Sequence, residues 1–167
     1  MTKSEENLKA AFAGESQANR KYLAFSEKAD KEGFPQIAKI FRAAAEAETV
    51  HAHNHLRELG GIKSTQENVR AAIEGEHYEF TKMYPEFLED AQGEGNKGAE
   101  RSFNYANEVE QVHHELYTKA LEAVKSGKDM EKQDVYICPV CGYTVEGEPP
   151  DKCPVCGALK KVFREIK

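Results

Sequence analysis

The chain has 167 residues, of which 40% are apolar and 31% are charged, and this size fits one medium domain with or without a very small second one. Its 29 acidic and 23 basic side chains give a net charge of −6, which argues against the basic face that a nucleic-acid partner requires. No apolar run approaches the roughly 18 residues of a membrane span, and the N-terminus has no signal-peptide core. We therefore expect a cytoplasmic protein with no nucleic-acid partner and no membrane partner.

The N-terminal three quarters of the chain are rich in Ala, Glu, Lys and Leu and predict four long helices. Capping-box patterns open the first helix at Thr2 and the third at Ser64, and Pro35 suits the first turn of the second. We expect Pro85 to kink the third helix rather than end it. Glycine-containing runs end the helices, so the expected spans are about 2–30, 35–59, 64–92 and 98–126.

A small cysteine-rich segment follows a polar linker at residues 128–134. Residues 135–167 are too few to bury a stable core without a staple. Two nearly identical stretches supply that staple, namely Cys138-Pro-Val-Cys141-Gly and Cys153-Pro-Val-Cys156-Gly. We predict a helical domain at residues 1–130 and a metal-stapled module at residues 135–167.

Each Cys-x-x-Cys turn directs two sulfur atoms at one point, and the glycine after it lets backbone amides face the sulfurs. Two such turns together make a tetrahedral four-sulfur site that suits zinc or iron. A pair of disulfides is the alternative, which we disfavour because nothing in the chain indicates an oxidising compartment. The spacing alone does not distinguish a structural zinc ribbon from a one-iron redox centre.

Ionisable side chains interrupt the apolar stripe of every predicted helix near its middle. They are Glu15 in the first helix, Glu48 and His51 in the second, Glu76 and Glu79 in the third, and Glu110 and His113 in the fourth. Burying unpartnered carboxylates is costly, and no Lys or Arg is in phase at those levels. Two metal cations would supply the positive charge and accept oxygen and imidazole ligands together. Glu74 and His77 have the same spacing as the pairs Glu48/His51 and Glu110/His113 but are out of phase, so we interpret them as solvated.

Several local strings resemble known families. Residues 14–22, 45–51, 73–79 and 109–113 are similar to the ligand segments of the di-iron carboxylate bundles of the ferritin-like class. Residues 137–143 and 153–158 are similar to the two knuckles of a rubredoxin module. Together they resemble the rubrerythrins over essentially the whole chain. The resemblance implies an all-α four-helix bundle of the ferritin-like class, followed by a small metal-stapled rubredoxin-like module.

The same resemblance implies roles for the ligands of two non-haem irons. Glu48 and Glu110 would bridge the irons, Glu15 and Glu48 with either Glu79 or His51 would hold one iron, and Glu76, Glu110 and His113 would hold the other. Reduction would exchange Glu79 for His51. Tyr22 and Tyr84, about two helical turns beyond Glu15 and Glu76, would donate hydrogen bonds to ligand carboxylates. The four cysteines, Cys138, Cys141, Cys153 and Cys156, would hold one iron that carries a single electron, with zinc as the alternative metal.

Peroxide reduction is the leading functional hypothesis. Two ferrous ions can deliver two electrons to hydrogen peroxide, and the rubredoxin-like iron would return electrons one at a time. The chain has no Gly-x-Gly-x-x-Gly motif for a dinucleotide, so the donor would be a separate NAD(P)H-dependent protein or a rubredoxin. The alternatives are a ferritin-like protein that oxidises and handles iron with a structural zinc ribbon, and a non-enzymatic sensor or scaffold.

The connection between the second and third helices bears on assembly, because these helices run parallel in ferritin-like bundles. Glu48 lies about 12 residues before the end of one helix and Glu76 about 11 residues into the other, which adds to roughly 34 Å. The connection from Gly60 to Ser64 reaches only about 17 Å when extended. Either the two helices form an antiparallel hairpin or chains exchange helix pairs. The resemblance favours a homodimer with exchanged helix pairs.

Overall fold

The computed structural model of the protein describes residues 2–167. Over these residues the helices are α1 (Lys3–Lys31), α2 (Pro35–Glu58), α3 (Thr65–Tyr78), the π-helix η1 (Glu79–Met83), α4 (Tyr84–Gly93), α5 (Lys97–Lys125) and the 3-10 helix η2 (Lys160–Val162). The strands are β1 (Val135–Ile137), β2 (Thr144–Glu146) and β3 (Arg164–Ile166). No helix in this part of the chain has the length and apolar character needed to cross a membrane.

Two compact units make up the chain, residues 1–63 and residues 64–167. The first contains α1 and α2, and the second contains the remaining helices together with the cysteine module. This division falls inside the predicted helical domain, because the helices pack as α1 with α2 and as α5 with α3, η1 and α4. The domain limits 1–130 and 135–167 stay a prediction.

The α1–α2 hairpin begins with the predicted capping box. The Thr2 side chain accepts a hydrogen bond from the Glu5 amide, and the Glu5 carboxylate accepts one from the Thr2 amide. Gly33 has a φ of 83° in the turn between the helices, a conformation that favours glycine. Pro35 occupies the first turn of α2, as its fixed φ favours.

The seam between α1 and α2 is lined largely by small side chains. Ala38, Ala45 and Ala52 recur every seven residues along α2 and are buried. Buried Asn19 of α1 donates hydrogen bonds to the Ala45 carbonyl at 2.7 Å and to the Thr49 hydroxyl at 2.8 Å. Alanine lets the helices approach closely, and larger side chains such as Phe25 and Ile37 remain exposed.

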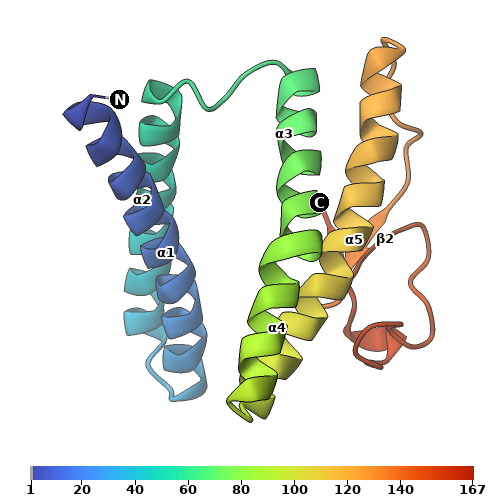
Figure 1. Ribbon diagram of the computed structural model, residues 1–167. Coiled ribbons are helices and arrows are strands. Elements are labelled where there is room, and N and C mark those ends of the chain that lie inside the picture. The colour runs from blue at the N-terminus through green and yellow to red at the C-terminus, as the bar shows by residue number, and fades with distance from the viewer. Residues whose placement is uncertain (1) are drawn as a thin grey trace. The chain divides into compact units, whose positions relative to one another are not determined.

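In the second unit, α3, η1 and α4 form one continuous helical ribbon beside α5 (Figure 1). The predicted capping box is present at Ser64 and Glu67. The helix continues past Pro85, as predicted, but the irregularity is a π-turn just before the proline. There the Tyr84 amide donates to the Glu79 carbonyl five residues back. A proline has no N–H for the carbonyl four residues before it, and the π-turn fits one extra residue at this point.

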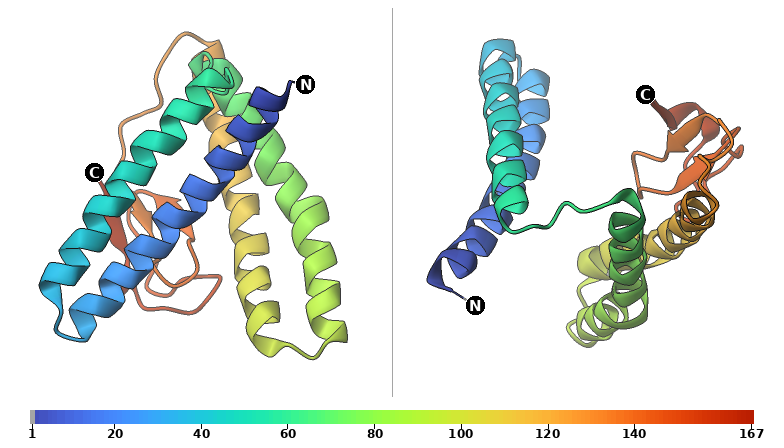
Figure 2. Two further views of the ribbon diagram at one scale, coloured as in Figure 1. Left: turned by 90° about the vertical axis from the view of Figure 1, so that its left-hand side faces the viewer. Right: turned by 90° about the horizontal axis from the view of Figure 1, so that it is seen from above.

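The cysteine module is a three-stranded antiparallel sheet in the order β2-β1-β3. Tyr136 in the central strand pairs with Val145 of β2 and with Glu165 of β3. The ring of Tyr143 packs edge-on against Phe163, with centroids 6.4 Å apart. The module lies against α5 through β2, and Figure 2 shows the strands beside that helix. Its position is therefore defined relative to the helices of its own unit.

Candidate metal centres

The α1–α2 hairpin brings together one carboxylate from α1 and a Glu-x-x-His pair from α2. Ligand atoms of Glu15, Glu48 and His51 all lie within 4.8 Å of one another. The Nδ1 atom of His51 is 2.8 Å from Oε2 of Glu48, because side chains three residues apart lie on one helix face. The side chain of His51 is 53% exposed. This hairpin group therefore has three of the predicted ligands and an accessible imidazole.

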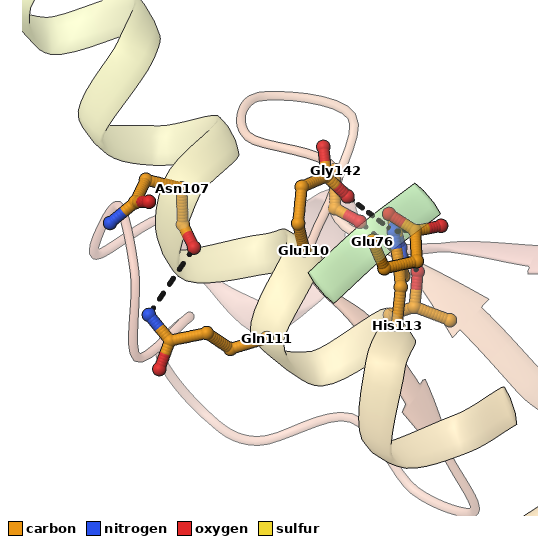
Figure 3. Close-up of polar contacts among 7 residues, drawn as sticks. Glu76, Asn107, Glu110, Gln111, His113 and Gly142 are labelled. Atoms are coloured by element: carbon orange, nitrogen blue, oxygen red, sulfur yellow. Dashed lines mark hydrogen bonds and ion pairs between the residues drawn. The ribbon is translucent and has the colours of Figure 1, made fainter. Parts of the chain in front are cut away.

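The second unit brings together an equivalent group from α3 and α5. Ligand atoms of Glu76, Glu110 and His113 lie within 4.8 Å of one another. The Nδ1 atom of His113 is 2.7 Å from Oε2 of Glu110 and 3.8 Å from Oε1 of Glu76. Figure 3 shows the three side chains pointing toward one another, with Asn107 and Gln111 directed elsewhere. We refer to these three residues as the α5 group.

The two carboxylates of the α5 group, Glu76 and Glu110, repel each other electrostatically. Burial, followed by the negative charge of Glu110, raises the pKa of Glu76 from 4.5 to about 7. The same two causes raise the pKa of Glu79, which adds a further carboxylate nearby. The hydrogen bond to Glu110 raises the pKa of His113, against the effect of burial. A cluster of partly buried acids with an imidazole fits divalent iron, whose charge and ligand preference match oxygen and nitrogen donors.

The π-turn brings Tyr84 onto the same helix face as Glu76 and Glu79. Tyr84 is eight residues after Glu76, one more than a regular α-helix needs to return to the same face. The extra residue of the π-turn absorbs this difference. Burial and then the charges of Glu110, Glu79 and Glu76 raise the pKa of Tyr84, so its hydroxyl lies near these carboxylates.

Tyr22 lies in the other unit, on α1, and is half-buried. Its ring packs against Phe25 and Phe41, with centroid distances of 6.4 and 6.2 Å. Seven residues separate it from Glu15 in a regular α-helix, so the two residues share a face of α1.

All four cysteine sulfurs of the module converge. They lie within 4.8 Å of one another, with 3.6 Å between Sγ of Cys138 and Cys156 and 3.5 Å between Sγ of Cys141 and Cys153. Four sulfurs about 2.3 Å from one metal would form a tetrahedron with edges of about 3.8 Å. All four are free thiols, so the disulfide alternative is wrong.

The two cysteine knuckles repeat one hydrogen-bond pattern. The Gly142 amide donates to the Cys138 carbonyl, and the Gly157 amide donates to the Cys153 carbonyl, both at 2.9 Å. Each glycine has positive φ, 90° and 76°, which turns the following amide toward a sulfur. Burial raises the pKa of the Cys138 thiol, but amide hydrogen bonds from Val140 and Cys141 outweigh it and leave that pKa lowered. Such donors stabilise a metal-bound thiolate.

The cysteine module contacts α5 at the α5 group itself. The Nε2 atom of His113 is 3.1 Å from Oγ1 of Thr144 in β2, and that hydroxyl is 3.1 Å from the Gly142 carbonyl. Gly142 directly follows Cys141, and a Cβ atom at this position would lie 3.7 Å from Cγ1 of Val109 in α5. An ion pair of 3.3 Å between Lys119 and Glu146 adds a second contact. The sequence analysis did not identify Thr144, because a lone threonine carries no metal-site signal.

Residues judged out of phase lie outside these clusters. Glu74 is exposed, as predicted, and so are Glu86 and Glu89. His77 is exposed, as predicted, and its ring and that of His114 pack against Phe80, with centroid distances of 5.4 and 5.5 Å. His114 is half-buried. Helical phase therefore separated the clustered carboxylates from the others, and it missed this aromatic contact.

Helices that present carboxylate and histidine groups, joined to a four-cysteine sheet module, define a ferritin-like metalloprotein with a rubredoxin-like domain. Residues 6–121 match the family model described as Rubrerythrin, and residues 136–164 match the one described as Rubrerythrin, rubredoxin-like domain. The chain belongs to the rubrerythrin family. It has that family's carboxylate–histidine di-iron groups and its four-cysteine group.

Curated relatives match the sequence of this chain over nearly its full length. Rubrerythrin-2 of Clostridium acetobutylicum is 38% identical, and the match covers 94% of this chain and 93% of the relative. Nigerythrin of Nitratidesulfovibrio vulgaris is 37% identical over 95% of this chain and 84% of the relative. Among solved structures, nigerythrin in its fully reduced, all-ferrous state matches with a TM-score of 0.59 and 34% identity, covering 99% of this chain and 88% of that one. The predicted fold class is therefore confirmed.

Proposed function

We propose that the protein is a hydrogen peroxide reductase whose electrons pass through the four-cysteine group. The observation that carries this proposal is the contact between His113 and Thr144, because it seats the cysteine module directly on a carboxylate–histidine group. A one-electron relay needs its metal close to the site that it serves, and this contact brings the four-cysteine group close to the carboxylate–histidine group. The contact therefore supports a redox role for both groups.

In this proposal the two groups would hold two irons, and Glu48 and Glu110 would each serve both. A bound di-iron centre supplies two electrons, so that hydrogen peroxide and two protons give two waters. Glu15, Glu48 and His51 would hold one iron, and Glu76, Glu110 and His113 would hold the other. Glu79 stands near enough to Glu110 for their charges to interact, which supports its role as an additional ligand.

Glu79 and His51 are proposed to alternate as ligands of one iron. A ferric ion gains from a further anion, whereas a ferrous ion is well served by a neutral nitrogen. The side chain of His51 is 53% exposed, and its Nδ1 atom contacts Oε2 of Glu48 at 2.8 Å. Tyr22 and Tyr84 are proposed to hold ligand carboxylates in place through their hydroxyl groups.

The donor is proposed to be a separate protein, either a rubredoxin or an NAD(P)H-dependent reductase in the cytoplasm. A direct test is anoxic reduction, followed by rapid mixing with peroxide and by steady turnover from a reduced rubredoxin. We expect fast oxidation of both metal groups and sustained peroxide consumption. The matched control is protein with zinc in the four-cysteine group, which should react once and then stop. Equal steady turnover in both preparations would contradict the relay.

The competing function is ferritin-like iron oxidation with a structural zinc ribbon. It predicts a colourless cysteine group in protein isolated with its native metals, and uptake of ferrous iron well beyond the ligand sets described above. Metal analysis with visible spectra separates the two functions, because a ferric four-sulfur centre is red.

We further propose that helix pairs are exchanged between two chains. In the parallel arrangement of the ferritin-like class, Glu48 and Glu76 share one level, ten residues before the last residue of α2 and eleven after the first of α3. Those stretches require about 32 Å along the bundle. The connecting residues 59–64 reach about 24 Å at most. A site would then take Glu15, Glu48 and His51 from one chain, and Glu76, Glu79, Glu110 and His113 from the other.

Mixed dimers test this exchange. Chains with Glu48→Ala and chains with Glu110→Ala are each inactive as homodimers, and they are refolded together in equal amounts. Exchange makes half of the dimers mixed, each with one intact site, so about a quarter of all sites recover. Without exchange every site keeps one defect and no recovery occurs. A monomer with full iron content at low micromolar concentration would also contradict the proposal.

A further inference from the structure

The hydroxyl of Thr144 has two partners and only one hydrogen to donate. Its Oγ1 atom is 3.1 Å from the Gly142 carbonyl oxygen and 3.1 Å from Nε2 of His113. A carbonyl oxygen can only accept, so the Thr144 hydrogen points to Gly142. The hydroxyl oxygen must then accept from His113, which places the imidazole hydrogen on Nε2.

This proton placement determines which nitrogen of His113 can bind a metal. A neutral imidazole has one protonated nitrogen and one lone pair. With the Nε2 hydrogen donated to Thr144, Nδ1 is the nitrogen left for a metal: without one, Nδ1–H donates to Oε2 of Glu110 at 2.7 Å and lies 3.8 Å from Glu76, and a bound metal would take the place of that hydrogen. The hydrogen bond to Thr144 therefore both selects the tautomer and aims the ring into the cluster.

Thr144 is itself held firmly. It belongs to β2 and pairs with Ile137 of β1, the residue directly before Cys138. A β-branched side chain in a strand has restricted rotamers. Thr144 is thus attached to the same knuckle that presents two of the four sulfurs, and its orientation depends on the folded, metal-stapled module.

We propose that Thr144 is a positioning residue for the carboxylate–histidine site: it fixes His113 as an Nδ1 ligand and so makes the cysteine module part of that site's support. The inference rests on the role of His113 in the proposed function. Its consequence is that the module serves the site sterically as well as electronically. His51 has no equivalent support within its hairpin.

The test uses full-length protein in which zinc alone fills every site, because zinc is diamagnetic and needs no redox chemistry. The variants are Thr144→Val, which keeps the shape but loses the hydroxyl, and Thr144→Ser, which restores it. Glu146→Gln is the matched control on the same strand, since it removes the ion pair to Lys119 and leaves His113 untouched. Zinc affinity of the carboxylate–histidine site is measured by competition with a chelator, and the ring nitrogens of His113 by 15N NMR.

We expect Nδ1 of His113 to bind zinc and Nε2 to carry a slowly exchanging hydrogen. Thr144→Val should weaken zinc binding about tenfold, the lower end for loss of such a support, and should speed exchange of the Nε2 hydrogen. Thr144→Ser and Glu146→Gln should stay within about threefold of the parent. Binding through Nε2, unchanged affinity in Thr144→Val, or an equal loss in Glu146→Gln would overturn the proposal.

His113→Ala separates this proposal from the function on which it rests. If His113→Ala loses zinc and Thr144→Val does not, only the role of Thr144 is wrong. If His113→Ala binds zinc like the parent, the ligand assignment fails and the positioning role fails with it. Peroxide turnover plays no part in either result, so a protein without peroxidase activity could still confirm Thr144.

Discussion

The two Glu-x-x-His pairs share one local geometry and differ in everything around it. The Nδ1-to-Oε2 distance is 2.8 Å in the Glu48–His51 pair of α2 and 2.7 Å in the Glu110–His113 pair of α5. Yet the His51 side chain is 53% exposed and the His113 side chain only 28%. Spacing on a helix fixes the pair, and the neighbouring elements decide how tightly the pair is held.

This asymmetry matches the two tasks proposed for the histidines. His113 is held by Thr144 from the cysteine module and stays within reach of Glu76. Within its hairpin, His51 contacts Glu48 through Nδ1, without a contact like the one between Thr144 and His113. A supported imidazole suits a permanent ligand, and an unsupported one suits a ligand that is exchanged when the oxidation state changes.

The largest expected effect comes from removing a bridging carboxylate. Glu110→Ala or Glu48→Ala should abolish two-iron occupancy, because each residue is assigned to both metals. Glu74→Ala is the matched control, since Glu74 is exposed and two residues from Glu76. The iron content per chain is measured for the two bridge variants and for the control. Two irons retained with full peroxidase activity in either bridge variant would show that the assignment is wrong.

The next effect sharpens the contrast between the histidines. His113→Ala should lose iron from its group in both oxidation states, because no other nitrogen replaces it there. His51→Ala should still bind iron when oxidised, with Glu79 in place, and should turn over poorly. Crystal structures of oxidised and reduced protein report the exchange directly. Identical Glu79 ligation and an unmoved iron in both states would refute it.

The sequence predicted those features whose cause is local. The caps at Thr2 and Ser64 and the stop at Gly127, with a φ of 71°, are determined by a few adjacent residues. Helical phase likewise grouped Glu76, Glu110 and His113 and set Glu74 apart. Each cysteine knuckle is defined by its own Cys-x-x-Cys spacing and glycine. The four-sulfur site could therefore be predicted without the rest of the fold.

Features that depend on distant packing were not predictable in the same way. Thr144 and His113 are 31 residues apart and meet only because the module lies on α5. Ala38 and Ala45 of α2 are buried while Ile37 is exposed, and the packing of α1 against α2 decides which face is covered. The π-turn left one trace in the sequence: Tyr84 follows Glu76 by eight residues, whereas Tyr22 follows Glu15 by seven.

The smallest effect concerns the crowded carboxylates of the α5 group without their metal. Burial, and then the charge of Glu110, raises the pKa of Glu76 from 4.5 to about 7. The folded protein therefore holds this proton more tightly than the unfolded chain does. Between about pH 4.5 and pH 7 the folded state binds more protons, so its free energy of unfolding falls as pH rises and levels off above about pH 7.

Glu76→Gln removes the ionisable group, so it should also remove this fall in the free energy of unfolding at higher pH. In protein with zinc kept in the cysteine group and none in the carboxylate–histidine groups, the variant should be more stable than the parent at pH 8 by about 1 kcal/mol. That figure is well below the full linkage value, because solvent screens a partly exposed group. At pH 4 the two proteins should differ little, since the carboxyl is then largely protonated in both states. Urea unfolding followed by helical circular dichroism measures the difference, with exposed Glu74→Gln as the matched control. If Glu74→Gln gained as much at pH 8, general relief of negative charge would explain the effect, and the proximity of Glu76 to Glu110 would not.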